Sequence, residues 1–341
     1  MKLGVLTNKK VLFRIILRNQ EEKMIAVNLF ISVLTIFFSS PAVSNGMVYF
    51  GNNNNYFYAL DVQTGELQWM FETGNEIDSS PAVSNGTIYF GSADNYLYAV
   101  NAKTGELQWR FETRDDIISS PAVSNGIVYF GSVDNYLYAV KAKTGKQLWK
   151  FKTREKIISS PAVSNGIVYF GSVDNYLYAV KAKTGKQLWR FEARDDIISS
   201  PAVSNGIVYF GSSDDYLYAL DSQTGQQQWK FETRDDIISS PAISNGIVYF
   251  GSSDDYLYAL DSQTGQQQWK FKARDEIISS PAVSNGIVYC GSGDGYLYSL
   301  DGKTGKQKWK YNAGNEIDSS PTVSNGAIYF QSYDGYLHSI E

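Results

Sequence analysis

Short runs of apolar residues alternate with polar turns along nearly the whole chain. In residues 118–153 the runs are ISSPAVS, IVYFGS, YLYAV and QLWKFKT, and they are separated by NG, VDN and KAKTGK. The runs are rich in β-branched and aromatic residues, which favour strands. This pattern predicts four short antiparallel strands and leaves no room for a helix.

The separating segments have the composition of tight turns. Asn125-Gly126 is the strongest two-residue hairpin signal, because a type I′ turn needs positive φ at both central residues. In the VDN segment, Asp134 and the following Asn can bond their own backbone, so we interpret Asp134 as a turn former with a lesser ligand alternative. Gly145 is free to adopt a left-handed conformation.

The same pattern recurs at a constant interval. The eight prolines of the chain are spaced forty residues apart, from Pro41 to Pro321, and each lies in a copy of the phrase SSPAVSNG. Residues 121–149 and 161–189 are identical at every position. A fixed period of this length indicates one continuous repeat array rather than several unrelated domains.

The runs IVYF and YLYAV are apolar on both faces, which predicts sheets that are covered on both sides. Four-stranded sheets that stack around an axis cover one another in this way, so the sequence predicts an all-β, eight-bladed β-propeller of four-stranded antiparallel blades. We expect residues 1–25 to be an N-terminal extension or targeting segment and residues 26–341 to form the single propeller. A closed ring of this kind is expected to be monomeric.

The chain contains eight copies of SSPAVSNG but only seven Trp-bearing fourth strands, so the last blade lacks its outer strand. Shifting the Trp69 strand back by forty residues reaches Ala26–Ser32, with Leu29 at the Trp position and Ile31 at the Phe71 position. We expect this segment to complete the last blade and close the ring. The alternative is that the apolar segment Met24–Phe38 belongs to a signal peptide that is cleaved near Ser39 or Ser40.

The fourth-strand region carries a recognisable motif. ALDSQTGQQQW, residues 219–229, resembles the tryptophan-docking motif of pyrroloquinoline-quinone (PQQ)-type propeller repeats, with Ala first, Gly seventh and Trp eleventh. In the copy that ends at Trp309, Ser299 replaces the Ala. The resemblance implies that each Trp is structural and packs flat between Ala and Gly of a neighbouring blade. These tryptophans are Trp69, Trp109, Trp149, Trp189, Trp229, Trp269 and Trp309.

The resemblance leaves two functional classes open. Some members of the family are quinoprotein dehydrogenases, which hold PQQ with calcium; others are non-catalytic scaffolds, sensory modules or adhesive modules, often in the cell envelope. The dehydrogenases often have a disulfide between adjacent cysteines and long insertions, whereas this chain has one cysteine, Cys290, and regular repeats. We therefore expect a non-catalytic module without a cofactor or metal, and a PQQ-dependent dehydrogenase is the alternative.

Other candidates for chemistry are few. His338 is the only histidine and replaces a repeat Tyr, while Cys290 replaces a repeat Phe, so both are expected to pack in the core. We expect no catalytic triad and no histidine-bearing metal cluster around His338. The Gly-rich segment at residues 291–296 is a variant of the repeat turn and has no following helix, which argues against a phosphate loop.

The linkers between blades carry the charged candidates for binding. Alternate connections of an antiparallel blade fall on opposite faces, so these linkers should form a ring of mixed charge on one face. With net charge −5 and no polybasic stripe, nucleic acid is not an expected partner. We expect a protein or repetitive polymer to bind there, in an extracytoplasmic or envelope setting, with a cytoplasmic setting as the alternative; the bland interpretation is a solvated rim of weak ion pairs. The candidate binding residues are Arg114, Asp115, Asp116, Arg154, Arg194, Asp195, Asp196, Arg234, Asp235, Asp236, Arg274 and Asp275.

Overall fold

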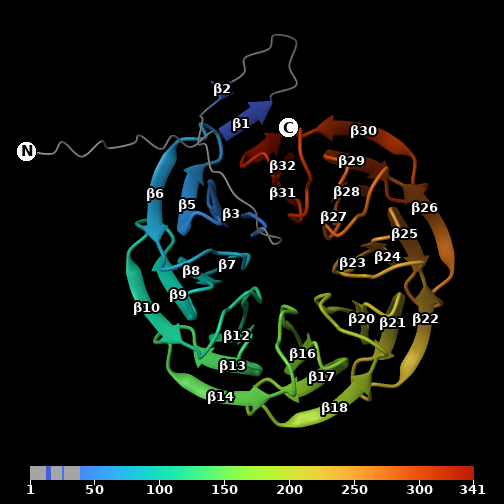
Figure 1. Cartoon of the computed structure of the whole chain (residues 1–341), viewed down its shortest axis with the longest axis horizontal. Helices are drawn as coiled ribbons and strands as arrows, with labels where there is room; N and C mark the ends of the chain where they lie inside the picture. Colours follow the sequence, from blue (N-terminus) through green and yellow to red (C-terminus); the bar gives the residue numbers. More distant parts are fainter. Residues whose placement is uncertain (1–12, 17–24, 27–38) are drawn as a thin grey trace, which may run out of the picture.

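A computed structural model describes residues 13–16, 25–26 and 39–341 of the chain. Eight sheets follow one another around a central axis (Figure 1). Seven of them are four-stranded and antiparallel, and each strand pairs with the next along the chain. The predicted all-β, eight-bladed propeller is therefore confirmed. Within the part of the chain that the structure describes, no helix has the length and hydrophobicity needed to cross a bilayer.

The first four blades have closely similar strand bounds. Blade 1 is β3 (Ala42–Ser44), β4 (Met47–Gly51), β5 (Tyr56–Asp61) and β6 (Leu67–Glu72). Blade 2 is β7 (Ala82–Ser84), β8 (Thr87–Gly91), β9 (Tyr96–Asn101) and β10 (Leu107–Glu112). Blade 3 is β11 (Ala122–Ser124), β12 (Ile127–Gly131), β13 (Tyr136–Lys141) and β14 (Gln147–Lys152). Blade 4 is β15 (Ala162–Ser164), β16 (Ile167–Gly171), β17 (Tyr176–Lys181) and β18 (Gln187–Glu192).

The remaining blades continue the series to the last sheet. Blade 5 is β19 (Ala202–Ser204), β20 (Ile207–Gly211), β21 (Tyr216–Asp221) and β22 (Gln227–Glu232). Blade 6 is β23 (Ala242–Ser244), β24 (Ile247–Gly251), β25 (Tyr256–Asp261) and β26 (Gln267–Lys272). Blade 7 is β27 (Ala282–Ser284), β28 (Ile287–Gly291), β29 (Tyr296–Asp301) and β30 (Gln307–Asn312). Blade 8 contains β31 (Thr322–Ser324), β32 (Ala327–Gln331) and β33 (Leu337–Ile340).

The Asn-Gly turns have the predicted geometry. Asn125 and Gly126 have φ of 50° and 73°, and all eight copies place both residues in the left-handed region that a type I′ turn requires. The turn joins the innermost strand of each blade to the second strand.

The hydrophobic core is divided among the blade interfaces. One cluster combines Ile167, Tyr169 and Leu177 of blade 4 with Val208 and Phe210 of blade 5, and the other interfaces repeat this arrangement. Each blade is covered on both faces, as the apolar strands predicted. The stability of one blade therefore depends directly on its neighbours.

Each tryptophan joins its own blade to the next one. The indole of Trp149 lies against Gly185 of blade 4, where an added Cβ would be 2.6 Å from Trp149 Cε3. Trp149 Nε1 donates to the carbonyl of Ala182 at 3.0 Å, and the Tyr129 hydroxyl donates to the same oxygen at 3.1 Å. The structural role and the Gly contact are confirmed, whereas the motif Ala lies opposite Trp149 on the same sheet, as Ala139 of blade 3.

Both serines of the repeated phrase have a structural partner. The first one, for example Ser199, accepts a hydrogen bond at Oγ from the Gly211 amide of its own blade at 3.1 Å. The second one accepts from the preceding blade, since the Ser160 amide donates to Ser200 Oγ at 2.9 Å. The series ends where it began, because the Ser320 amide donates to Ser40 Oγ at 2.9 Å. The second serines therefore form a closed circle of eight hydrogen bonds.

An N-terminal strand does complete the last sheet, but the sequence placed it wrongly. The free edge of β33 pairs with β1 (Phe13–Ile16), in parallel, and β1 in turn pairs with β2 (Ile25–Ala26) (Figure 1). Of the predicted closing strand Ala26–Ser32, only Ala26 lies in the described part, where it is opposite Arg14 of β1 rather than a residue of β33. Residues 27–32 lie outside the described residues.

Blades 8 and 1 also make contacts that the other junctions lack. Gln331 stands where the other blades have Gly, and its side-chain amide donates to the carbonyls of Ser39 and Gly51. The Thr322 hydroxyl donates to the Pro41 carbonyl. Described residues of blade 1 and blade 8 also share one apolar cluster, which contains Phe50 and Tyr329. The ring is thus closed at its inner side by hydrogen bonds and apolar packing.

Replacing Gly185 and Gly166 by Ala should separate steric exclusion by Trp from backbone strain. Both glycines have positive φ, 68° and 76°, but an added Cβ meets the Trp149 indole at Gly185 and no atom within 4 Å at Gly166. We expect Gly166→Ala to lower the free energy of unfolding by about 1–2 kcal/mol from strain alone. Gly185→Ala should lower it by roughly 2–3 kcal/mol more. Equal losses in chemical denaturation would contradict the Trp–Gly dock.

Ser40→Ala and Ser200→Ala should have similar effects if the circle of hydrogen bonds is closed. Each change leaves one half-buried amide, that of Ser320 or Ser160, without its acceptor. The expected loss is about 1–2 kcal/mol of unfolding free energy in both variants. A negligible effect of Ser40→Ala beside a clear effect of Ser200→Ala would show that blades 8 and 1 are not joined in this way.

Candidate functional site

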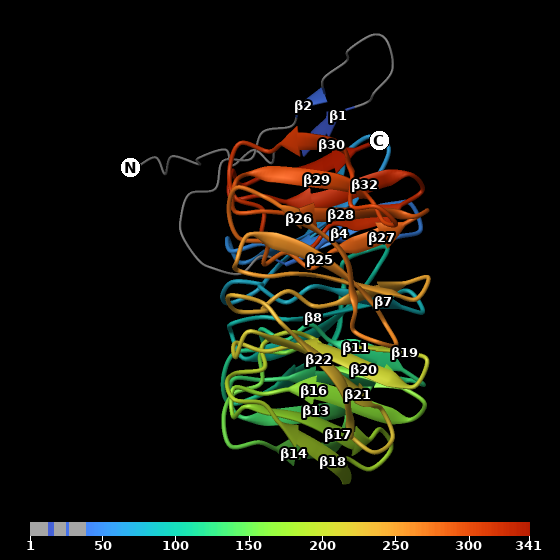
Figure 2. The same cartoon turned by 90° about the vertical axis from the view of Figure 1, so that its right-hand side faces the viewer.

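The propeller has two chemically different faces on either side of the ring (Figure 2). The linker face is formed by the linkers between blades, such as residues 113–118, and by the Asp-containing turns between the second and third strands, such as residues 132–135. The turn face is formed by the Asn-Gly turns and by the Thr-Gly turns between the third and fourth strands, such as residues 142–146. Antiparallel pairing alone assigns the connections to these faces, as the sequence predicted.

The linkers are held firmly by backbone and side-chain hydrogen bonds. The Thr113 hydroxyl donates to the carbonyls of Asn95 and Asp115, at 2.8 and 2.7 Å. The Ile117 amide donates to the Ser92 carbonyl of blade 2, and Ser132 Oγ of blade 3 donates to the Asp115 carbonyl. Each linker is therefore anchored to the blade before it and the blade after it.

The Asp of each second turn completes this framework. Asp134 accepts from the amide of Tyr136 at 3.1 Å, the Tyr138 hydroxyl at 2.6 Å and the amide of Arg114 at 3.2 Å. These contacts confirm Asp134 as a turn former. They also attach the linker to the blade through the backbone of Arg114, which leaves its guanidinium outside this network.

The charged linker residues project from this rigid base. The structure leaves nine of the twelve candidate residues exposed, while Asp116, Asp196 and Asp236 are partly buried. The guanidinium of Arg154 lies 5.8 Å from the Tyr176 ring centre. Within residues 39–341, the ion pairs are Lys308–Asp301 and His338–Asp334, and neither involves a linker. The linker residues therefore do not form the local ion pairs along the rim that the alternative interpretation expected. The exposed candidates are Arg114, Asp115, Arg154, Arg194, Asp195, Arg234, Asp235, Arg274 and Asp275, together with the linker residue Glu155.

Three partly buried linker carboxylates, Asp116, Asp196 and Asp236, have pKa values raised above the ordinary value. Burial raises the pKa of Asp236, and the nearby charges of Asp235, Asp215 and Asp195 raise it further. Asp116 and Asp196 show the same direction, with burial as the main cause. The linker face is thus a surface where negative charge is concentrated and where a cationic partner would relieve repulsion.

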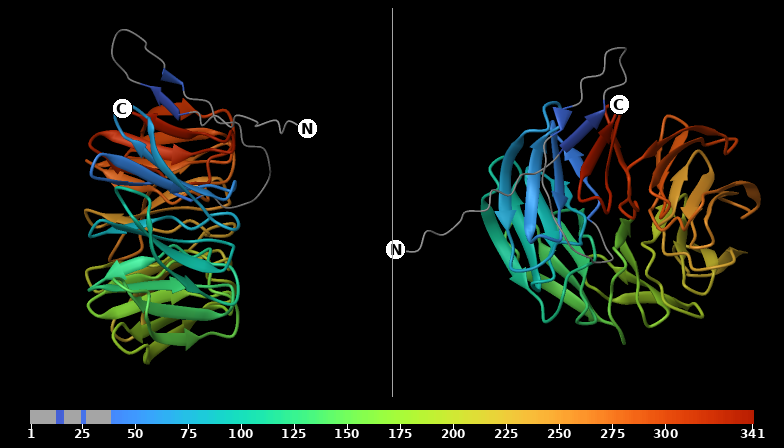
Figure 3. Two further views of the ribbon diagram at one scale, coloured as in Figure 1. Left: turned by 90° about the vertical axis from the view of Figure 1, so that its left-hand side faces the viewer. Right: turned by 45° about the horizontal axis from the view of Figure 1, so that its top comes forward.

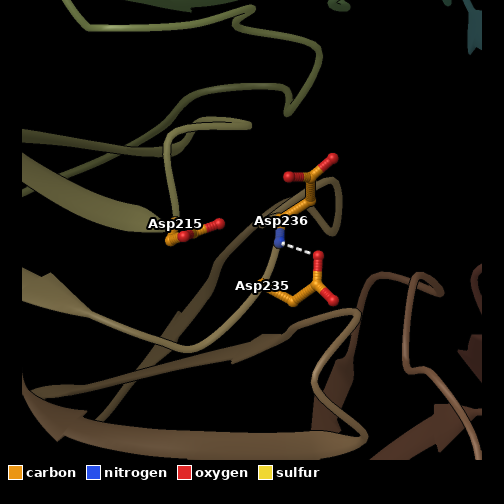
Figure 4. A group of neighbouring side chains, drawn as sticks. All are labelled: Asp215, Asp235 and Asp236. Carbon is orange, nitrogen blue, oxygen red and sulfur yellow. Dashed lines mark hydrogen bonds between the residues drawn. The ribbon is translucent and has the colours of Figure 1, made fainter.

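One group of carboxylates comes close enough to share a cation. Oxygens of Asp215, Asp235 and Asp236 lie within 4.8 Å of one another (Figure 4), and Asp235 Oδ1 accepts from the Asp236 amide at 2.9 Å. Asp215 replaces the Asn of earlier repeats, so this trio occurs at the junction of blades 5 and 6. One oxygen from each of the three carboxylates converges here, which is fewer than the roughly 6–8 oxygens that Ca²⁺ takes.

The sequence analysis missed two partly buried carboxylates on the linker face. Asp78 and Asp318 each end a GNEID segment, whereas the five intervening linkers have Ile at this position. Burial raises the pKa of Asp78 to about 7, with help from Glu76 and Asp116, and Asp78 Oδ1 has no hydrogen-bond partner. Burial likewise raises the pKa of Asp318 to about 6, although a hydrogen bond with Tyr333 acts in the opposite direction. The repeated departure from Ile was the available signal.

His338 and Cys290 have the predicted core positions. His338 is 1% exposed, lies parallel to Phe330 at 4.9 Å between ring centres, and Nε2 contacts Asp334 Oδ2 at 3.1 Å. It therefore takes the place of the repeat Tyr, which bonds the same turn Asp. Cys290 is fully buried, and burial raises the pKa of its thiol, so the thiol is inert.

The described residues do not fit a cradle for a quinone cofactor with its metal. Such a group needs metal-binding oxygens and quinone-binding residues in one place. Asp78 and Asp318 lie on the linkers between blades 1 and 2 and between blades 7 and 8, whereas the trio around Asp235 lies at blades 5 and 6. Asp78 and Asp318 are surrounded by further acids, which would repel an anionic quinone.

Eight blades, of which the first seven are joined in the described residues by six Trp–Gly docks, define the class of PQQ-like β-propellers. The family model described as "Outer membrane protein assembly factor BamB" matches residues 32–119, 115–198, 196–278 and 254–341. The chain belongs to this family, and the match confirms the resemblance of the tryptophan-docking repeats. A search of curated protein sequences gives no significant match.

Solved structures share the fold at low sequence identity. The computationally designed Ika8 protein is 20% identical with a TM-score of 0.81, covering 89% of this chain and 95% of that one. BamB from Moraxella catarrhalis is 19% identical with a TM-score of 0.76, covering 86% and 93%. A europium-containing methanol dehydrogenase is 15% identical with a TM-score of 0.73, covering 87% and 81%. Because a non-enzymatic assembly factor and an enzyme both share it, the fold does not decide the activity.

Asp78 and Asp318 should make the propeller more stable at mildly acidic pH. Their folded-state pKa values exceed the ordinary 3.8, so the folded protein binds more protons than the unfolded chain between about pH 4 and 7, and stability falls as pH rises through that window. Asp78 alone should contribute on the order of 3–4 kcal/mol. Asp78→Ile with Asp318→Ile, the residue of the other linkers, should raise the melting temperature at pH 8 and flatten its pH dependence. An unchanged slope between pH 5 and 8 would contradict this assignment.

Proposed function

We propose that this protein is a non-catalytic binding or scaffold propeller of the cell envelope, and that its linker face recognises a protein or a repetitive polymer. One observation carries the proposal. Exposed Arg and Asp side chains stand on linkers that are fixed by hydrogen bonds on both sides, and in the described residues they make no ion pairs with one another. They are preorganised for contact with something else.

The physical advantage of this arrangement lies in its rigidity and repetition. A rigid loop loses little conformational entropy on binding, so each contact keeps more of its interaction energy. Five consecutive linkers, beginning at Arg114 and ending at Arg274, present an Arg followed by an acidic residue at intervals of one blade. A partner with repeated or extended charge could engage several of them together, and the gain in avidity would not require any one strong site.

Membership of the BamB family supports a protein partner and an envelope location. The matched family is described as an outer membrane protein assembly factor. Binding residues are expected on loops that a rigid scaffold positions, and the linkers meet that description.

The alternative function, a PQQ-dependent dehydrogenase, is favoured only by the similarity of the fold to a methanol dehydrogenase. It can be tested without knowledge of the partner. We expect that adding PQQ and Ca²⁺ to the purified protein produces no stoichiometric bound-quinone absorbance after gel filtration. A tightly bound quinone in the expected one-to-one ratio would overturn the proposal of a non-catalytic module.

Reversing three acids of the linker face should abolish partner capture without unfolding the propeller. In Asp115→Lys, Asp195→Lys and Asp235→Lys combined, each change should alter stability by no more than about 0.5 kcal/mol, because the side chains are exposed. We expect the variant to lose partners that the native protein retains in a crosslinking pull-down from envelope fractions. Glu66→Lys, on an exposed position of the turn face in blade 1, is the control charge reversal and should retain them. Equal capture by both variants would contradict a role for the linker face.

A further inference from the structure

The turn face of blades 3 and 4 carries three lysines in each blade, at positions where blades 1, 5 and 6 have none. Blade 2 has one lysine at these positions, Lys103, and blade 7 has two, Lys303 and Lys306. The third strand and following turn read VKAKTGKQLW in blades 3 and 4, but LDSQTGQQQW in blades 5 and 6. All six lysines of blades 3 and 4 are exposed. We name the group the lysine patch, and it consists of Lys141, Lys143, Lys146, Lys181, Lys183 and Lys186.

The two halves of the lysine patch are held side by side. Trp149, at the start of β14 in blade 3, lies against Gly185 and donates to the carbonyl of Ala182 at 3.0 Å. Both of these partners belong to the turn of blade 4 that carries Lys183. The dock that joins the blades therefore also fixes the spacing of the two lysine-bearing turns, and Figure 1 shows β14 and β18 adjacent at the edge of the ring.

In the described part of the propeller, none of these six lysines forms an ion pair with an acidic side chain. The ion pairs there involve Lys308 with Asp301 and His338 with Asp334, in blades 7 and 8. The adjoining turns have acids only at the margins, at Glu106 in blade 2 and Asp221 in blade 5. The patch is thus a local excess of six positive charges on a protein whose net charge is −5.

Exposed leucines border the lysine patch. Leu148 and Leu188 are 40% and 39% exposed, and each follows its Thr-Gly turn near the turn-face end of the outer strand. Blades 5 and 6 have Gln228 and Gln268 at these positions. Each segment therefore combines three lysines with one accessible apolar side chain, and both kinds of residue are replaced together in blades 5 and 6. Blade 2 has a single turn lysine, Lys103, and an exposed leucine one position earlier in the strand, Leu107.

We propose that the lysine patch, with Leu148 and Leu188, binds the surface of an anionic phospholipid bilayer. Clustered lysines are attracted to anionic headgroups, and adjacent apolar side chains can enter the boundary between headgroups and acyl chains. The connections of the blades emerge on two opposite sides of the ring (Figure 3), and the strand order places the acidic linker face on the side away from the patch. An anionic surface would repel that face and attract the patch, so the propeller would be oriented with its linkers directed into solution.

The leucines favour a bilayer over a soluble polyanion. A nucleic acid or acidic polysaccharide would be bound by the lysines alone, because phosphate or carboxylate contacts gain nothing from an exposed Leu in water. A bilayer interacts favourably with both the lysines and the leucines. The dependence of binding on Leu148 and Leu188 therefore distinguishes the two kinds of ligand.

The experiment is sedimentation of the full chain with vesicles of phosphatidylcholine alone or with about 30% phosphatidylglycerol, at low and high salt. The test variant carries Lys141→Asp, Lys143→Gln, Lys146→Gln and Leu148→Gln with the same changes forty residues later. At the substituted positions it then has the residues that blades 5 and 6 already have, so it should fold. We expect binding of the native protein only to anionic vesicles, weakening with salt. The variant should bind at least tenfold more weakly, since each lysine near such a surface contributes on the order of fivefold.

Two further variants make the result specific. Leu148→Gln with Leu188→Gln should weaken vesicle binding severalfold and leave binding to heparin, a soluble polyanion, unchanged. The reverse exchange in blades 5 and 6, Asp221→Lys, Gln223→Lys, Gln226→Lys and Gln228→Leu with their counterparts, should strengthen vesicle binding. Unchanged vesicle binding by the test variant with eight substitutions would overturn the proposal. So would tighter binding to heparin than to vesicles with no effect of the leucines, which would indicate a polyanion instead.

Discussion

The joins between consecutive blades from blade 1 to blade 7 depend on one carbonyl group in the Thr-Gly turn of each of blades 2 to 7. The Ala182 carbonyl accepts both the Trp149 indole N–H and the Tyr129 hydroxyl, from two strands of the preceding blade, while Gly185 in the same turn supports the indole. A blade is thus attached to its neighbour through a turn whose geometry only a positive-φ glycine allows. Any insertion between the Trp and the next turn would move all these partners together. This explains a spacing of forty residues without exception.

The inner side of the ring imposes a second constraint, which acts on the whole circle. Each second serine accepts from the blade before it and its amide donates to the blade after it, and the bond from Ser320 to Ser40 leaves no terminal member. Linear stacks need polar caps at their ends, but a circle does not. The last blade instead uses side chains found nowhere else in the series, such as Gln331, to reach the first blade.

Repetition determines how much the sequence could predict. Features present in each copy, such as the Asn125-Gly126 turn and the apolar second and third strands, could be identified because eight examples support one interpretation. The prediction of the closing strand was wrong for the opposite reason, because this strand occurs once and has no copies to compare. A shift of forty residues pointed to Ala26–Ser32, but the edge of β33 is recognised mainly by backbone pairing, which Phe13–Ile16 also satisfies, and in parallel. The carboxylates at Asp78 and Asp318 were missed because their effect depends on burial, which the repeat pattern does not reveal.

Differences between nearly identical copies indicate where function is to be sought. Residues 140–149 of blade 3 and the equivalent residues 220–229 of blade 5 share the turn Thr, the Gly and the Trp. They differ at side chains that the dock does not use. Those positions can change charge without disturbing the dock, although the Asp221 carboxylate of blade 5 also accepts hydrogen bonds from the Gln223 and Thr224 amides of its own turn. On the linker face the same separation holds, since the Arg114 amide is structural and its guanidinium is exposed. A scaffold that bonds its neighbours through backbone atoms can therefore carry an acidic face and a basic patch on opposite sides without loss of the ring.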